Sequence, residues 1–236
     1  MKTDELHGRV ALVTGASRGI GAAAAEALAS RGAHVVISAR NIKGLEEVED
    51  RIHALGGSAT IAPVDLAEPD AIARLAAAIQ QRWDRLDCLV ISAAYLPLLT
   101  PVAHIDPKEF GKALTVNVLA TQALLAAFDP LLRRSGKGRI VGLTSSVGRA
   151  ARPYWGAYAA TKAAFETLLD CYAQEVGNIT GTRVAIIDPG ATRTDMRARA
   201  FPGEDAVTLK TPDVVAQRIA DLVTTGFQNG HRERVA

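Results

Sequence analysis

The chain has 236 residues, of which 48% are hydrophobic and 22% charged, a globular composition that excludes an intrinsically disordered chain. Lysine and arginine number 27 against 25 aspartate and glutamate, a formal net charge of +2, so we expect no nucleic-acid partner. The two cysteines, Cys88 and Cys171, are too few for a disulfide framework and favour a reducing compartment, the cytoplasm. The polar N-terminus lacks the apolar core of a signal peptide.

Residues 113–128 could be read as a membrane-spanning helix because they include no charged residue. The stretch is shorter than the roughly 18 apolar residues of a spanning helix. It also contains four polar residues, namely Thr115, Asn117, Thr121 and Gln122. We therefore expect no membrane association, and instead a helix buried between a sheet and a neighbouring element.

Predicted strands and helices alternate along the chain. Short apolar runs predict strands, with a weaker pattern for the last, at 9–14, 34–39, 58–64, 87–93, 138–145, 182–188 and 229–236. Helical spacing predicts helices, the longest with room for a break near its middle, at 19–30, 43–55, 69–83, 107–132, 157–176 and 212–224. This alternation predicts an α/β protein with a doubly wound parallel sheet, three α/β/α layers and one domain over residues 1–236.

A glycine-rich turn follows the first predicted strand and opens the first predicted helix. It has the sequence TGASRGIG over residues 14–21. Gly15 can form the tight turn, Gly19 lets the backbone approach a pyrophosphate, and Gly21 lets the helix pack close to the strand. The helix N-terminus would then face the phosphates. With GxxxGxG spacing alone, an ordinary glycine-rich turn is an equal alternative.

The end of the second strand bears on the choice of cofactor. An NAD site usually places a carboxylate there for the ribose 2′-hydroxyl, but residues 38–41 read Ser-Ala-Arg-Asn. Arg40 and Arg18 can instead hold a 2′-phosphate together. Asp65, after the third strand, can accept a hydrogen bond from the adenine amino group, and a role as a turn or cap carboxylate is equally compatible with the sequence.

Tyr158 and Lys162 lie four residues apart on a predicted helix, so their side chains share a face. A phenol with a pKa near 10 is a poor acid or base at neutral pH, and a neighbouring ammonium is expected to lower that pKa. The pair can then move a proton to or from a substrate oxygen, with Ser145 as a further donor. A YxxxK pattern alone is common by chance, so this hypothesis depends on the serine, the glycine turn and the parallel sheet.

Together these motifs resemble the classical short-chain dehydrogenases/reductases, and the likeness runs from about residue 8 to residue 196. The serine precedes the tyrosine by 158 − 145 = 13 residues, the usual separation in that family, which selects Ser145 over Ser146. The ordered motifs are TGxxxGxG at 14–21, Asn117, Ser145, Tyr158 with Lys162, and Pro189-Gly190. The resemblance implies a Rossmann-type fold and a nicotinamide cofactor that carries the hydride.

The resemblance also implies a role for each site residue. Tyr158 would be the general acid or base, Ser145 would polarise the carbonyl, and Lys162 would assist Tyr158 and hold the nicotinamide ribose. Asn117 would keep a water relay behind Lys162 and completes the predicted catalytic set. The predicted cofactor-binding residues are Gly15, Ser17, Arg18, Gly19, Ile20, Gly21, Arg40, Asn41, Asp65, Leu66, Ser92, Ala93, Tyr158, Lys162, Pro189, Gly190, Thr192 and Thr194.

Three further features of the sequence bear on the predicted site. The family's usual Asn-Asn-Ala-Gly after the fourth strand is Ile91-Ser92-Ala93-Ala94 here, so hydrogen bonds that brace the central sheet are expected to be lost. Residues 193–209, a segment that is usually a substrate lid in that family, are few, and their arginines would either steer an anionic substrate or be solvated. The five scattered histidines show no metal-binding spacing, so no metal site is predicted.

The sequence therefore predicts an NADP(H)-dependent oxidoreductase that interconverts a carbonyl and a secondary alcohol, with NADP(H) preferred over NAD(H). A reductase of 3-oxoacyl groups on a carrier is the nearest alternative, and a non-catalytic NADP-binding regulatory protein is another. The partners would be a small-molecule carbonyl or alcohol and further copies of the chain. A homodimer or homotetramer is expected to form through residues 113–132 and 157–176.

Overall fold

The computed structural model describes residues 4–236. They form a parallel sheet with the strand order β3-β2-β1-β4-β5-β6-β7. The strands are β1 (Val10–Thr14), β2 (His34–Ala39), β3 (Ser58–Pro63), β4 (Cys88–Ile91), β5 (Arg139–Leu143), β6 (Arg183–Asp188) and β7 (His231–Arg234). The weakly marked C-terminal segment is thus a true strand, paired with β6. The strand order reverses beside β1, and ligands of such sheets bind at this switch point.

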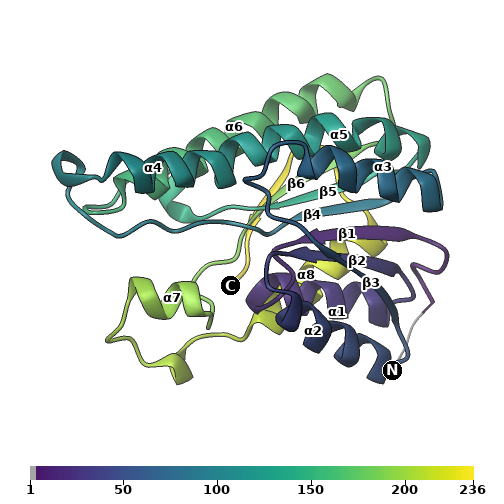
Figure 1. Cartoon of the computed structure of the whole chain (residues 1–236), viewed down its shortest axis with the longest axis horizontal. Coiled ribbons are helices and arrows are strands. Elements are labelled where there is room, and N and C mark those ends of the chain that lie inside the picture. The colour runs from purple at the N-terminus through teal and green to yellow at the C-terminus, as the bar shows by residue number, and fades with distance from the viewer. Residues whose placement is uncertain (1–3) are drawn as a thin grey trace.

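Helices cover both faces of the sheet, as Figure 1 shows. One face carries α3 (Ala71–Trp83), α4 (Pro107–Leu114), α5 (Ala120–Arg134) and α6 (Gly156–Gly177). The other face carries α1 (Gly19–Ser30), α2 (Ile42–Ala54) and α8 (Pro212–Thr225). A short helix, α7 (Asp195–Ala200), lies apart from these layers in the predicted lid. The predicted single-domain α/β/α Rossmann-type fold is confirmed.

Two apolar cores explain why the strands bury both of their faces. Val13 and Val35 pack with α1, α2 and α8 in one core, while Leu12 and Val36 pack with α3, α5 and α6 in the other. Neighbouring residues of one strand therefore enter different cores, as the period of two requires. This double burial is why the strands are continuous apolar runs.

The long helical segment 107–134 is continuous. Between α4 and α5 the backbone forms a π turn, Thr115–Leu119, which keeps the two helices continuous at the point where the sequence left room for a break. By length and composition alone this segment is apolar enough to cross a membrane. Its residues Leu124, Phe128 and Leu132 are nevertheless fully buried against the sheet, as predicted for a core helix.

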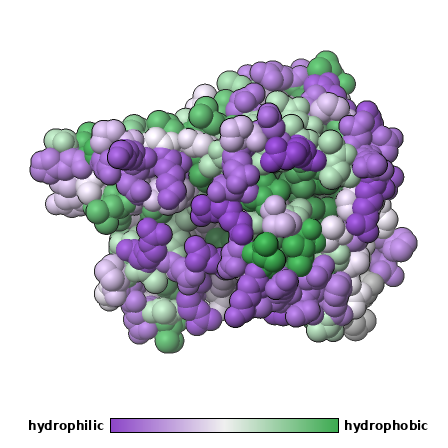
Figure 2. Space-filling model, in the orientation of Figure 1, coloured by the Kyte–Doolittle hydropathy of each residue, from purple (hydrophilic) through white to green (hydrophobic). Residues whose placement is uncertain are grey.

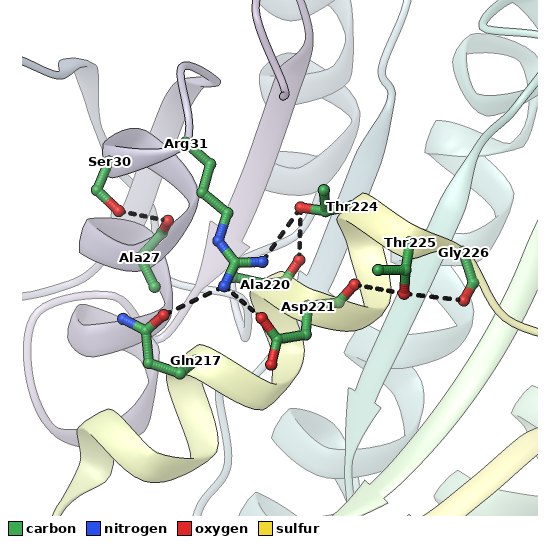
Figure 3. A network of polar contacts seen from close by, with 9 residues as sticks. All are labelled: Ala27, Ser30, Arg31, Gln217, Ala220, Asp221, Thr224, Thr225 and Gly226. Atoms are coloured by element: carbon green, nitrogen blue, oxygen red, sulfur yellow. Dashed lines mark hydrogen bonds and ion pairs between the residues drawn. The ribbon is translucent and has the colours of Figure 1, made fainter. Parts of the chain in front are cut away.

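The C-terminal end of α1 is joined to α8 by the side chain of Arg31 (Figure 3). Its guanidinium donates hydrogen bonds to Thr224 Oγ1 and to Gln217 Oε1, each at 3.2 Å, and forms an ion pair with Asp221. The Arg31 side chain is only 15% exposed. The network therefore fixes α8, which follows the lid segment, to the helix that begins at the glycine turn.

Gly142 allows α6 to pack directly on β5. A Cβ atom at this position would lie 2.3 Å from Leu169 Cδ1 and 2.8 Å from Phe165 Cζ, and both side chains are buried. We expect Gly142→Ala to lower the free energy of unfolding by about 1–3 kcal/mol, because overpacking displaces core side chains. Urea denaturation measures this loss. Gly111→Ala is the control: nothing lies within 4 Å of that position, so equal midpoints in both variants contradict the prediction.

Candidate active site

A cavity of about 820 Å³ opens at the carboxyl ends of the strands, and such a volume suits a cofactor-sized ligand. Figure 2 shows this side of the molecule hollowed between the part that carries α4 and the part that carries α7. Most of the predicted cofactor-binding residues line the cavity, namely Gly15, Ser17, Arg18, Gly19, Ile20, Gly21, Arg40, Asn41, Asp65, Leu66, Ser92, Ala93, Tyr158, Lys162, Pro189 and Thr194.

The glycine turn has the backbone shape that only glycine adopts easily. Gly15 and Gly19 have φ angles of +68° and +57°. A Cβ on Gly15 would lie 2.8 Å from the backbone of Ala93, and one on Gly21 would lie 2.3 Å from the carbonyl oxygen of Gly15. The turn therefore brings the N-terminus of α1 close to the ends of β1 and β4. This helix end, which favours anions, opens into the cavity.

A threonine braces the atypical segment after β4. Thr14 Oγ1 accepts hydrogen bonds from the amides of Ser92 (3.2 Å) and Ala93 (3.3 Å), and donates one to the carbonyl of Val90 (3.3 Å). Ile91 cannot make the hydrogen bonds of the family's usual asparagine side chain, but the backbone of this segment is still held to β1. The hydroxyl of the TGxxxGxG threonine ties β1 to β4 through backbone groups, which do not depend on the side chains of 91–94.

The two arginines predicted to hold a 2′-phosphate line the cavity, and each faces a carboxylate. Arg18 lies 3.1 Å from Asp195 of α7, and Arg40 lies 3.7 Å from Asp65. Both arginine side chains are largely exposed, at 73% and 63%, so these ion pairs are weak. Asp65 also accepts a hydrogen bond from the Ala67 amide at 3.0 Å, which is the turn role that the sequence left open.

One buried hydroxyl in the cavity wall has no partner within the described chain. Ser38 lies at the end of β2, is 1% exposed and lines the cavity, and its Oγ makes no hydrogen bond. Buried polar groups are nearly always satisfied. Together with the glycine turn and the two arginines, this unpaired group fits a cofactor with ribose and phosphate oxygens.

The predicted proton-transfer pair lies in the wall of the same cavity. Tyr158 and Lys162 stand one turn apart on α6, and both are buried, with 5% and 3% exposure. Tyr158 Oη lies 3.9 Å from Met196 Sδ of α7, and Lys162 Nζ donates a hydrogen bond of 2.7 Å to the Leu143 carbonyl. Ser145 follows the end of β5 and precedes a 3₁₀ turn, Ser146–Gly148, designated η3.

Burial sets the protonation of this pair. It raises the pKa of the Tyr158 phenol well above its usual value, and the negative charge of Asp188 adds to the effect. Burial lowers the pKa of Lys162 to about 8, against the opposing effect of Glu166. The expected lowering of the tyrosine pKa by Lys162 is therefore not found, because the ammonium bonds to Leu143 and both groups are desolvated. Tyr158 keeps its proton at neutral pH, the state that a general acid requires.

Asn117 lies in the π turn, and both polar atoms of its side-chain amide make hydrogen bonds. Its Oδ1 accepts from the Tyr95 amide at 2.7 Å, and its Nδ2 donates to the Tyr95 carbonyl and to Thr161 Oγ1, each at 2.9 Å. It thereby joins the segment after β4 to α6.

The predicted residues outside the cavity lining are Asn117, Ser145, Gly190 and Thr192.

Gly190 and Thr192 shape the turn that leads from β6 to the lid. Gly190 has φ +62°, and Thr192 Oγ1 donates to the Pro189 carbonyl at 3.0 Å. Thr194 then caps α7 by accepting a hydrogen bond from the Arg197 amide at 3.2 Å. Their positions support the lid that carries Met196 onto Tyr158.

Several cavity residues were absent from the predicted site set. Lys112 and Val116 share a face of the long helical segment, and Lys112 Nζ lies 4.4 Å from the ring centroid of Tyr95. Lys112 lies five residues and Val116 one residue before Asn117, so helical spacing from Asn117 points to neither of them. The other residues that line the cavity outside that set are Ser38, Ala39, Val64, Ala94, Tyr95, Leu143, Thr144, Arg193, Asp195, Met196 and Pro212. Within residues 4–236, no group of three or more His, Cys, Asp or Glu side chains is placed to hold a metal ion.

Comparison with known proteins defines the family. A family model described as short chain dehydrogenase matches residues 9–205. An Escherichia coli protein, "Uncharacterized oxidoreductase YciK", is 40% identical over 214 residues, which cover 89% of this chain and 84% of that protein. The fold superimposes with a TM-score of 0.95 on a short chain dehydrogenase from Pseudomonas syringae, 38% identical, covering 100% of this chain and 98% of the other.

A further solved structure includes a cofactor. It is a short chain dehydrogenase from Shigella flexneri complexed with NADP, with a TM-score of 0.92, 37% identity and coverage of 99% of both chains. The family match and these likenesses establish that the chain belongs to the short-chain dehydrogenases, an oxidoreductase family.

Proposed function

We propose that this chain is an NADP(H)-dependent oxidoreductase of the cytoplasm that interconverts a small-molecule carbonyl compound and a secondary alcohol. The observation that carries the proposal is the buried pair Tyr158 and Lys162, one turn apart, in the wall of the cavity that the glycine turn also lines. The NADP bound to the Shigella flexneri relative supports the choice of cofactor.

In this proposal each residue of the chain has a definite task. The bound nicotinamide supplies or accepts the hydride. Tyr158 gives its phenolic proton to the carbonyl oxygen in reduction and takes it back in oxidation. Lys162, positively charged and 5.8 Å from the tyrosine ring centroid, stabilises the phenolate that forms after proton transfer. Ser145 donates a hydrogen bond to the same oxygen, and Asn117 holds the backbone on which Tyr95 lies.

The test is a substrate panel of ketones, aldehydes and 3-oxoacyl thioesters, followed by the loss of NADPH absorbance. Turnover of simple ketones or aldehydes supports the proposal. A strong preference for the thioesters favours the carrier-linked reductase. Tight NADPH binding without turnover of any compound favours a regulatory protein, and absence of NADPH binding contradicts all three functions.

We further propose that copies of the chain assemble through α5 and α6. Leu119, the residue directly before α5, is 61% exposed, and the outer positions of α6 include the small residues Ala160, Ala163 and Thr167. Such faces become buried when like helices pack together. Light scattering at micromolar concentration is expected to give the mass of a dimer or tetramer, and Leu119→Glu is expected to shift it towards the monomer. A monomeric wild-type chain contradicts this.

A further inference from the structure

A buried carboxylate lies directly behind the predicted catalytic residues. Glu166 follows Tyr158 and Lys162 on the same face of α6, at successive steps of four residues, and is 5% exposed. Its Oε1 accepts a hydrogen bond of 2.7 Å from Thr144 Oγ1, and its Oε2 accepts hydrogen bonds from Arg149 Nε at 2.7 Å and Arg232 Nη1 at 2.6 Å. A buried charge persists only when it is paired in this way.

These partners come from three separate parts of the fold. Thr144 follows the last residue of β5, Arg149 follows η3, and Arg232 lies in β7. Arg232 also forms an ion pair with Asp170, one turn further along α6. The hydrogen bonds outweigh the effect of burial and lower the pKa of Glu166, so the carboxylate stays charged while it joins these elements.

The segment held by Glu166 contains Ser145. Thr144 lies one residue before this serine and Arg149 four residues after it. Between them, η3 packs so closely on α6 that a Cβ on Gly148 would lie 3.2 Å from Glu166 Oε1 and from Lys162 Cβ. One carboxylate thus contacts both ends of the segment, and its position on α6 relative to Tyr158 is fixed by the helix.

We propose that Glu166 is a positioning residue, whose carboxylate sets the distance between Ser145 and the Tyr158–Lys162 pair by holding Thr144 and Arg149. The inference rests on the proposed function, because it concerns the alignment of the residues that would meet the carbonyl oxygen. It also gives β7 a part in the site, since Arg232 neutralises the buried charge from the C-terminal strand. Small displacements of aligned groups are costly in rate.

The activity test compares two pairs of variants of the full chain. Thr144→Val removes the hydroxyl but keeps the shape, whereas Thr144→Ser restores the donor. We expect Thr144→Val to lower kcat by about tenfold, because it leaves one oxygen of Glu166 without its hydrogen bond. We expect the Kd of Thr144→Val for NADPH to stay close to the wild-type value. We expect the kcat of Thr144→Ser to stay close to the wild-type value as well. Glu166→Gln is expected to lower kcat at least as much. Asp170→Asn, which removes an ion pair of Arg232 but no hydrogen-bond partner of Glu166, is expected to retain it.

A second measurement does not depend on turnover. The amides of Gly148, Arg149 and Ala150 donate hydrogen bonds to carbonyls of Ser145 and Ser146, so their hydrogen exchange reports the order of this segment. We expect faster exchange at these amides in Thr144→Val and Glu166→Gln, and wild-type exchange in Thr144→Ser and Asp170→Asn. Amides of β4 serve as the internal reference.

The outcomes separate this inference from the proposed function. Wild-type kcat and exchange in folded Thr144→Val and Glu166→Gln overturn the positioning role. A loss of rate that Thr144→Ser does not rescue overturns it as well, since the hydroxyl is then irrelevant. If the wild-type chain reduces no carbonyl compound, the proposed function fails, and the exchange data alone decide whether Glu166 orders the segment. If Glu166→Gln fails to fold, the two Thr144 variants decide.

Discussion

Tyr158→Phe is expected to lower kcat for carbonyl reduction by about 10²–10⁴-fold, the usual contribution of a general acid. The substitution removes only the hydroxyl, which lies 3.9 Å from the thioether sulfur of Met196. The buried ring, 6.0 Å from the ring centroid of Trp155, remains in place. The Kd for NADPH should therefore change little. Steady-state kinetics and NADPH fluorescence titration measure the two quantities.

A second tyrosine provides the control for this experiment. Tyr154 lies four residues before Tyr158 and is 60% exposed, so Tyr154→Phe removes a hydroxyl near the site but outside the cavity lining. It should leave kcat close to the wild-type value. Near-normal turnover by Tyr158→Phe, with normal NADPH binding, would falsify the role of Tyr158 as the acid. An equal loss of rate in both variants would point to a disturbance of the loop before α6.

Most of the fold was predictable because local signals and tertiary packing agree. The bounds of α1 (19–30) and β2 (34–39) match the prediction, since an alanine-rich helix and an apolar β-branched strand each follow a glycine-containing turn. Predicted residues converge on one cavity because each follows the carboxyl end of a parallel strand or lies on the helix after it. Chain order alone therefore places motifs that are distant in sequence at one edge of the sheet.

What the sequence left open depends on contacts between distant segments. Helix α7 has only six residues and buries none of them fully, so no apolar period marks it. Its local signals are limited to the Thr194 cap and to charges that suit the helix dipole. The raised pKa of Tyr158 arises from burial beneath this lid and from the charge of Asp188. The partner of Arg18 is Asp195, 177 residues later in the chain. None of these follows from periodicity or spacing.

The same ion pairs bear on the preference for NADPH, which we expect the wild-type chain to bind more tightly than NADH. The two cofactors differ only by the 2′-phosphate on the adenosine ribose, so residues beside that group must discriminate between them. Ala39 at the end of β2 leaves no carboxylate to repel the phosphate, and Arg40 follows it into the cavity. Arg18 lines the same cavity from the glycine turn.

The size of the preference for NADPH depends on the free-energy difference between the arginines' hydrogen bonds to the 2′-phosphate and their ion pairs with carboxylates. A hydrogen bond to a charged group contributes about 1.5–3 kcal/mol, whereas the exposed pairs with Asp195 and Asp65 are worth about 0–1 kcal/mol each. The phosphate therefore displaces the weaker partners. The net gain corresponds to roughly one to three orders of magnitude in Kd. If both arginines stayed with their carboxylates, the preference would be slight.

Titration of NADPH and NADH into the wild type and into Ala39→Asp/Arg40→Leu decides between these cases. The double substitution adds a carboxylate that repels the 2′-phosphate and can accept a hydrogen bond from the ribose 2′-hydroxyl of NADH, and it removes one guanidinium. We expect its Kd for NADPH to rise and its Kd for NADH to fall. Arg51→Leu is the control, because that arginine lies on α2, pairs with Glu26 and does not line the cavity, so its loss should leave both constants unchanged. Equal wild-type constants for the two cofactors, or a variant that keeps the wild-type ratio, would show that the end of β2 does not select the cofactor.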